Sequence, residues 1–397
     1  MTAWAPQVFT PHPAHPRILF ARVAARSAAF EPTSAAGGSP VLVGSAAGHD
    51  RARVALGARG ELLERLGNVM AGREAEAVPE LVGTFTELKR GGIPAVEPRP
   101  QPGEQPRADT RRLWVRGRTA GGAEVFVPAG SAFLHHRPPA GCDAAQSSGS
   151  TGIAAHPDAA AAIRHAAWEV LERDLIRRSW YGLADRPPGP VAAALPPPLA
   201  GFVRERGLTA TVFALPAPAR AACVVVCLHR PNGTGQAFGA RCGPSDGAPA
   251  LNSLVEKAAY EALMVRWSMG TEVARRAWQR WRGATPPASA VQHALWAYHR
   301  QDSLRLWGVR PGAGPGPGDA AGAAGATDPP GSPGPPAAPD APDPLDVLSG
   351  HTGQDVVLVD TTSAPAREAG VRVVRVLAPG ALPLPSGGGA GHPHPFG

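Results

Sequence analysis

Two short stretches of this chain, ELLER at residues 61–65 and EVLER at residues 169–173, place paired glutamates three residues apart. A weaker third copy contains Glu261 and Arg266. On a helix, side chains at positions i and i+3 share one face, so each pair directs two carboxylates to the same point. We therefore expect glutamate-bearing helices that face one cleft. Such a cleft would bind a hard cation such as Mg2+, which prefers oxygen ligands.

The same glutamates allow a second interpretation. Glu61 with Arg65, and Glu169 with Arg173, are also spaced as i,i+4 ion pairs, which are common on solvated helix faces. In the functional interpretation the arginines would instead contact phosphate oxygens, because the planar guanidinium matches phosphate geometry. Both interpretations stay open at the level of sequence.

Composition indicates a folded part joined to low-complexity parts. Of 397 residues, 43% are hydrophobic, while Gly (48) and Pro (46) make up about a quarter. The net charge is +7, but the basic residues are almost all arginine and are spread along the chain. Their densest run, residues 275–282, interleaves Arg with Trp and predicts an amphipathic helix with Trp inward. We expect no nucleic-acid partner.

The four cysteines form no CxxC pair, so no zinc ribbon is predicted. Cys223 and Cys227 flank three valines and are expected to be small core residues of a strand. We find no signal-peptide pattern and no apolar stretch of membrane-spanning length. A soluble cytoplasmic protein without a membrane partner is expected.

The chain is divided into four segments. Residues 1–40 receive no assignment, residues 41–310 form a catalytic domain, residues 311–347 are a disordered Pro/Gly/Ala insert, and residues 348–397 add C-terminal strands and a proline-containing tail. Helices and strands follow from the apolar periodicity. The predicted helices are 52–70, 157–181 and 252–266, and the predicted strands lie in 113–134, 209–215, 221–229, 355–361 and 371–377.

Two loops carry polar side chains. Residues 146–152 (QSSGSTG) precede the second glutamate helix, whose N-terminal amides could hold an anion; an ordinary capped turn is the alternative. His135 and His136 are adjacent and so point in different directions, which indicates surface or turn residues rather than ligands. Walker A and serine-elbow motifs are absent.

Several segments, in this order along the chain, resemble the motifs of the YcaO family. The loop 150–155 (STGIAA) followed by 169–174 (EVLERD) is similar to the family's Ser-Asn-Gly loop and Glu-x-x-Glu-Arg-Asp helix. The ending PHPF resembles the proline-alternating tail of azoline-forming members, which make thiazole/oxazole-modified peptides. The other matching segments are 55–65, 258–266, 293–298 and 355–361.

The resemblance implies an α+β fold with mixed sheets and an ATP- and Mg2+-dependent cyclodehydratase. Its substrate would be a ribosomal precursor peptide, delivered by a leader-peptide-binding partner; a flavin-dependent dehydrogenase and a homodimer are further implied partners. By carry-over, the metal ligands would be Glu61, Glu64, Glu169 and Glu172. Nucleotide contacts would come from Ser150, Thr151, Arg65, Arg173, Glu261 and Arg266, and the tail residues Pro393, Pro395 and Gly397 would help catalysis.

Four positions depart from the family pattern. Gly57 stands where a serine is expected, Thr151 replaces an asparagine, Met264 replaces a glutamine, and Gly397 replaces a final proline. These departures keep a non-catalytic scaffold open as an alternative. A thioamide- or macroamidine-forming enzyme is the second alternative, because it would use the same activated amide with another nucleophile.

Overall fold

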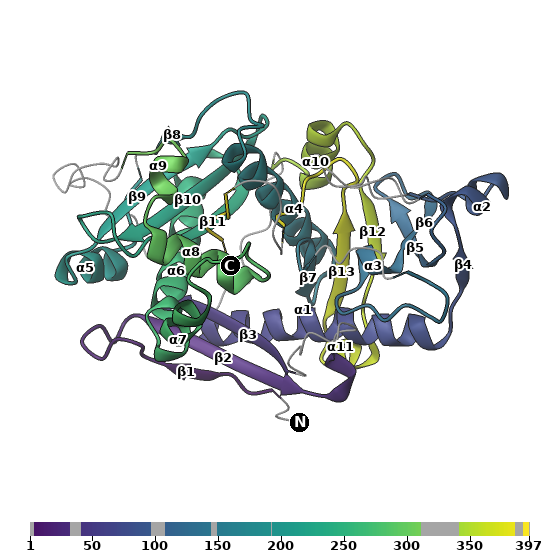
Figure 1. The fold of residues 1–397 in the computed structure, drawn as a ribbon, viewed down its shortest axis with the longest axis horizontal. Helices are drawn as coiled ribbons and strands as arrows, with labels where there is room; N and C mark the ends of the chain where they lie inside the picture. The colour runs from purple at the N-terminus through teal and green to yellow at the C-terminus, as the bar shows by residue number, and fades with distance from the viewer. Residues whose placement is uncertain are drawn as a thin grey trace. The chain divides into compact units, whose positions relative to one another are not determined.

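The computed structural model describes residues 4–31, 41–96, 108–143, 149–191, 193–310, 341–385 and 392–396. The chain forms two compact units (Figure 1). Unit 1 combines Met1–Arg177 with Pro344–Ser386, and unit 2 combines Arg178–Asp343 with Gly387–Gly397. Of the three predicted glutamate helices, the first two therefore lie in unit 1 and the third lies in unit 2.

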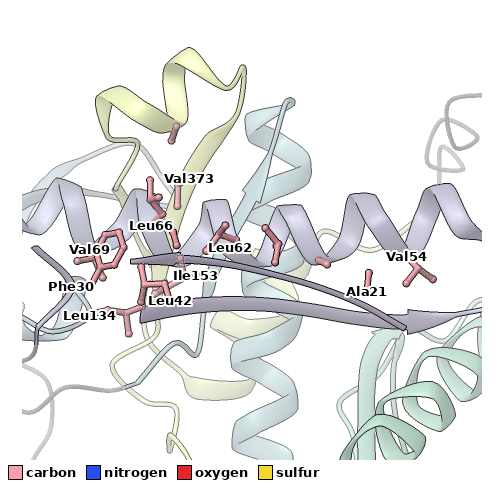
Figure 2. Close-up of a cluster of buried hydrophobic side chains, with 14 residues drawn as sticks. Ala21, Phe30, Leu42, Val54, Leu62, Leu66, Val69, Leu134, Ile153 and Val373 are labelled. Carbon is pink, nitrogen blue, oxygen red and sulfur yellow. The ribbon is translucent and has the colours of Figure 1, made fainter. Parts of the chain in front are cut away.

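Unit 1 is organised around the long helix α1 (Arg51–Ala77), which begins at Asp50. The Asp50 side chain accepts a hydrogen bond from the amide of Arg53 and so caps the helix. One face of α1 packs on a three-stranded antiparallel sheet of β1 (Gln7–Phe9), β2 (Leu19–Arg26) and β3 (Val41–Gly48). Figure 2 shows the larger cluster of buried apolar side chains to which this contact belongs.

A six-stranded sheet covers another face of α1. Its order is β4 (Leu81–Gly83), β5 (Arg112–Thr119), β12 (Val357–Asp360), β13 (Arg372–Leu377) and β7 (Ile153–His156), with β6 (Glu124–Pro128) paired to β5. A Cβ on Gly67 of α1 would lie 2.6 Å from Val373 of β13, so helix and sheet are in close contact. The other helices of unit 1 are α2 (Phe85–Arg90), α3 (Ala129–Ala132), α10 (Pro344–Thr352), α11 (Ala364–Glu368) and most of α4 (Ala159–Trp180).

Unit 2 contains a four-stranded antiparallel sheet with the order β11 (Ala237–Pro244), β10 (Ala221–His229), β9 (Thr209–Leu215) and β8 (Gly189–Pro190). Helix α6 (Gly247–Met269) packs on β10 and β11. The remaining helices are α5 (Pro197–Glu205), α7 (Glu272–Trp281), α8 (Ala290–Arg300) and α9 (Ser303–Leu306). Helix α7 buries Trp281 and exposes its arginines, as its amphipathic pattern predicts.

Most predicted elements are present. Strands β9 and β10 have the predicted bounds, and Cys223 and Cys227 are buried on β10. The segment 1–40, left without assignment, contains β1 and β2. The predicted insert 311–347 was too long, because α10 begins at Pro344; residues 311–340 lie outside the described part. Among the described residues, no helix is long and apolar enough to cross a membrane.

The prediction for the histidine pair was partly wrong. His136 is buried, and its Nδ1 lies 2.8 Å from Glu76, while the His135 ring contacts the carbonyl of Phe30 at 2.8 Å. Glu76 also accepts hydrogen bonds from Arg73 and from the amide of Arg137. His135 lies in a turn, as predicted, and the two rings contact different groups. His136 is not a surface residue, because it takes part in a buried polar network at the end of α1.

Candidate nucleotide and metal site

The first glutamate–arginine pair caps the edge of a sheet. Glu61 accepts a 2.5 Å hydrogen bond from the amide of Ser45, and Arg65 donates to the carbonyl of Val43 at 2.8 Å. Both partners lie on β3, which is an edge strand of its sheet. The two side chains also pair with each other at 2.6 Å. The i,i+4 ion pair is therefore present, and it satisfies backbone groups that an edge strand leaves without a strand partner.

Carboxylates from α1 and α4 crowd together in unit 1. Burial raises the pKa of Glu64 well above its usual range, and repulsion from Glu169 and Glu61 raises it further. Arg65 and Arg375 act in the opposite direction. The two predicted glutamate helices thus bring carboxylates close enough to repel each other, which is the donor chemistry that a hard cation such as Mg2+ requires.

On α4, the ion pair between Glu172 and Arg173 is more buried than the pair between Glu61 and Arg65. Glu172 has 1% of its surface exposed, and its Oε1 lies 3.6 Å from Nε of Arg173. Asp174, which follows in the sequence, is fully buried and lies 2.6 Å from Nε2 of His351. It also accepts a hydrogen bond from the amide of Leu382 at 2.7 Å. One turn of α4 therefore carries both a candidate ligand, Glu172, and an anchor for the segment after β13, Asp174.

The loop with Ser150 and Thr151 is held at both ends. Arg375 donates to the carbonyl of Gly149 at 2.9 Å, and the amide of Gly152 donates to Glu169 at 3.1 Å. Gly152 has a φ of +78°, and a Cβ there would lie 2.5 Å from the carbonyl of Val376 on β13. Only glycine fits this position, so the two hydroxyls stand on a loop with a fixed backbone.

The predicted anion site at the N-terminus of a helix was wrong in one respect. Strand β7 separates the loop from α4, which begins at Ala159. The side chain of Asp158 accepts hydrogen bonds from the amides of Ala160 and Ala161 and so occupies that helix end. An anion at the loop would be bound by the loop itself.

The third glutamate helix presents its residues in unit 2. Glu261 lies 3.5 Å from Nη2 of Arg241 on β11. The Arg266 guanidinium donates to the carbonyl of Gly235 and lies 5.8 Å from the centre of the Tyr298 ring. Burial lowers the pKa of Arg266. Its role as a phosphate ligand, and the meeting of Glu261 with the glutamates of unit 1, stay predictions.

The C-terminal tail is buried in unit 2. Phe396 has 2% of its surface exposed and packs beside Phe238 and Trp307, with ring centres 6.1 and 6.0 Å away. The His394 ring stacks on His293 of α8 with centres 3.7 Å apart. These receiving residues were missed by sequence reasoning, although His293 lies in the segment that resembles the family's aromatic motif. Pro393 is half-buried, Pro395 is buried, and Gly397 lies outside the described residues.

Within the described residues, no three His, Cys, Asp or Glu side chains are already arranged as a metal-binding group. The crowding of Glu64, Glu169 and Glu61 is nevertheless the feature that fits a divalent cation, because an added positive charge would relieve the repulsion between them. The residues of unit 1 therefore fit the implied metal in their chemistry, and the ligand set itself is a prediction.

Among the described residues the named strands pair in an antiparallel manner, and helices pack on the sheets, so the fold class is α+β. The family described as YcaO cyclodehydratase, ATP- and Mg2+-binding, matches residues 43–382. The chain belongs to the YcaO family. The fold class and the family predicted from the motifs are confirmed, and the cofactors of the family, ATP and Mg2+, are those predicted.

Solved structures support the fold. YcaO from Methanopyrus kandleri bound with AMPPCP and Mg2+ is 19% identical, with a TM-score of 0.57, over 94% of this chain and 85% of that chain. A heterocyclase in complex with substrate and cofactor is 18% identical with a TM-score of 0.65; the match covers 95% of this chain but 50% of the heterocyclase. A chain of the E. coli microcin synthetase McbBCD complex is 13% identical with a TM-score of 0.54, and the match covers 96% of this chain and 89% of the other. No curated protein sequence matches this chain.

Proposed function

We propose that this chain is an ATP-dependent cyclodehydratase that forms thiazoline or oxazoline rings in a ribosomal precursor peptide. The observation that carries the proposal is the crowding of carboxylates from α1 and α4, where Glu169 and Glu61 raise the pKa of Glu64. Membership of the YcaO family supplies the reaction class.

The reaction closes a ring on the peptide backbone. The side chain of a Cys, Ser or Thr attacks the carbonyl carbon of the preceding amide, and its proton is lost. The former carbonyl oxygen then leaves with a phosphoryl group, while the amide nitrogen loses its proton and forms the C=N bond of the ring. ATP supplies that phosphoryl group, and Mg2+ neutralises the charge that develops during the transfer.

The residues of this chain would bind and orient the reactants. Glu64, Glu169 and Glu172 would hold the metal, since their carboxylates are the oxygen donors that Mg2+ prefers. The loop with Ser150 and Thr151 would fix the nucleotide, because its backbone is anchored at Gly149 and Gly152.

The C-terminal tail in unit 2 would help to order the catalytic site. The burial of Phe396 would hold the neighbouring Pro393 and Pro395 in place. A tail held in one conformation can present its groups to a substrate without a further ordering cost.

The partners of the proposal come from similar proteins. One solved relative is a heterocyclase in complex with its substrate, and another is the microcin synthetase McbBCD complex with pro-MccB17 bound. By analogy, this chain would act on a precursor peptide within an assembly that includes a leader-peptide-binding protein. We further propose a cytoplasmic location, since ATP and a newly made precursor are both available there.

Calorimetric titration with ATP and Mg2+ tests the nucleotide site. Wild-type protein is expected to bind, and Glu64→Gln and Glu172→Gln are expected to weaken binding at least about tenfold, because each removes a charged oxygen ligand. Glu74→Gln is the matched control: Glu74 is an exposed glutamate of the same helix α1. Absence of binding by the wild-type protein, also with the partner protein present, contradicts the proposal.

A scaffold without ATP turnover is the second candidate. It is favoured by one observation: the guanidinium groups of Arg65 and Arg266 are engaged by the backbone carbonyls of Val43 and Gly235. Mass spectrometry of the precursor peptide after incubation with ATP, Mg2+ and the partner separates the two functions. A loss of water from the peptide supports the enzyme, and precursor binding without any mass change supports the scaffold.

A further inference from the structure

A buried arginine lies where the two glutamate helices and the polar loop meet. Arg375 is in the middle of β13 and has 2% of its surface exposed. In the sheet it pairs with Ile153, the first residue of β7, directly after the loop 149–152. No sequence motif singles out Arg375, because it lies within a mostly apolar strand, VRVVRVL.

Arg375 contacts the loop and acts on both glutamate helices. Its Nη1 donates to the carbonyl of Gly149 at 2.9 Å. Burial lowers its pKa to about 10, and the carboxylates of Glu169 and Glu64 oppose that shift. The same loop also binds Glu169 of α4, because the amide of Gly152 donates to this carboxylate at 3.1 Å. The loop therefore brings the guanidinium of Arg375 into the neighbourhood of the carboxylates, and an arginine side chain carries a positive charge at neutral pH.

We propose that Arg375 is a positioning residue with two opposite effects on the metal–nucleotide site. It orders the loop that carries Ser150 and Thr151, which favours the nucleotide. It also competes with Mg2+ for the carboxylates of Glu64 and Glu169, which disfavours the free metal. The inference rests on the proposed function, since it assumes that these carboxylates bind Mg2+.

The two effects have a chemical consequence. A fixed cation beside the carboxylates neutralises part of their charge, so Mg2+ alone gains less by binding there. Mg2+ that arrives with ATP is also held through the phosphates, which the ordered loop receives. Arg375 thus favours binding of the metal–nucleotide complex over binding of Mg2+ alone.

Substitutions at Arg375 separate the two effects. Arg375→Gln removes the charge, and we expect Mg2+ alone to bind about fivefold more tightly while a non-hydrolysable ATP analogue with Mg2+ binds about tenfold more weakly. Arg375→Lys keeps the charge but loses the guanidinium fork. For this variant we expect metal affinity within about twofold of wild type and weakened binding of the analogue.

The matched control is Arg372→Gln. Arg372 lies on the opposite face of the same strand and is exposed to solvent. Its substitution by Gln changes the net charge by the same amount as Arg375→Gln. It is expected to alter neither affinity by more than about twofold, because exposed charges are screened. Thermal unfolding of each variant identifies the temperature range in which all proteins are folded and can be titrated.

The opposite directions are the decisive result, since a merely loosened structure would weaken both ligands. Equal weakening of Mg2+ and of the analogue in Arg375→Gln, or no change in either, overturns the inference while leaving the proposed function intact. If the wild-type protein binds no analogue, the proposed function fails. The metal arm still decides whether Arg375 competes with Mg2+, because it uses Mg2+ alone.

Discussion

Lowering the pH from about 7.5 to about 5 should destabilise unit 2 through one buried histidine. His293 on α8 has 1% of its surface exposed, and its ring stacks on His394 of the tail with an angle of 8° between the planes. Burial lowers the pKa of His293 from 6.5 to about 4, although the backbone of His394 partly offsets the shift. The stack therefore depends on a neutral His293.

The sign and size of the effect follow from linkage. In the unfolded chain His293 takes up a proton as the pH falls through 6.5, whereas in the folded protein it stays neutral until about pH 4. Stability is therefore full above pH 6.5 and is lost as the pH falls toward 4. A shift of about 2.5 units is worth about 3 kcal/mol in full, of which about 2 kcal/mol is lost by pH 5.

Urea unfolding at both pH values, for wild type and His293→Phe, measures this contribution. Phenylalanine keeps a flat ring that can stack on His394 but cannot take up a proton. The loss of unfolding free energy on acidification should be smaller in the variant by about 2 kcal/mol. Groups that lie away from the stack keep the same surroundings in both proteins, so their contributions cancel in the comparison. The same loss in both proteins would falsify the assignment of this pH dependence to His293.

Three further predictions concern packing and charge elsewhere. Gly44→Ala should destabilise unit 1 by about 3 kcal/mol in chemical unfolding, because its Cβ would lie 2.1 Å from the carbonyl of Ala58. As the control, a Cβ at Gly60 of α1 meets nothing within 4 Å, so Gly60→Ala should stabilise the protein by about 1 kcal/mol. A Gly44→Ala variant that is more stable than the Gly60→Ala variant contradicts the packing described. Burial opposes ionisation of Glu76, but hydrogen bonds from a histidine, a backbone amide and an arginine outweigh burial and lower the pKa of this carboxyl group. The ionised Glu76 therefore stabilises the folded protein above the unfolded pKa of about 4.3, and this stabilisation is lost as the pH falls through the lower pKa of the folded state. Glu76→Gln should remove that acid dependence in scanning calorimetry, and an unchanged dependence contradicts it. Phe396→Ala should cost about 3–5 kcal/mol of tail packing and expose the tail to limited proteolysis, and a tail as protected as in wild type contradicts the burial described.

The elements that could be predicted are those with strong local patterns. Strands β9 and β10 are continuous apolar runs between turn residues, and their bounds were predicted correctly. Helix α1 was predicted from an apolar stripe over 52–70 and continues to Ala77, because no proline stands between Arg51 and Pro79. Strand β2 was missed because its inward residues are mostly small and its outward residues include Arg22 and Arg26, which gives a weak alternation.

The candidate site divides in the same way. The glutamates could be selected from their spacing, which is local along a helix. Arg375 could not, because it meets Gly149, Glu64 and Glu169 only through the pairing of β13 with β7 and the packing of α1 and α4. His351 likewise meets Asp174 across 177 residues of chain. Such partners are set by tertiary contacts that no local pattern encodes.

The repeated sequence pattern encodes helix packing as well as charge. Gly44 of β3 lies against Ala58 of α1, and Gly239 of β11 lies against Ala258 of α6, where a Cβ would approach the alanine carbonyls to 2.1 and 2.2 Å. Each glycine thus lets a helix backbone approach an edge strand closely.

One turn of helix beyond each alanine stands a glutamate, Glu61 in α1 and Glu261 in α6. The helix–strand contact therefore fixes where this first carboxylate stands, which explains why Glu61 also caps the strand edge through Ser45. The second carboxylate, another turn along, is free of that packing constraint. It is Glu64 in α1 but Met264 in α6, so α6 carries one glutamate of the pattern where α1 and α4 each carry two. The recurrence of the glycine contact therefore explains by packing alone why the first glutamate stands at the same place on both helices.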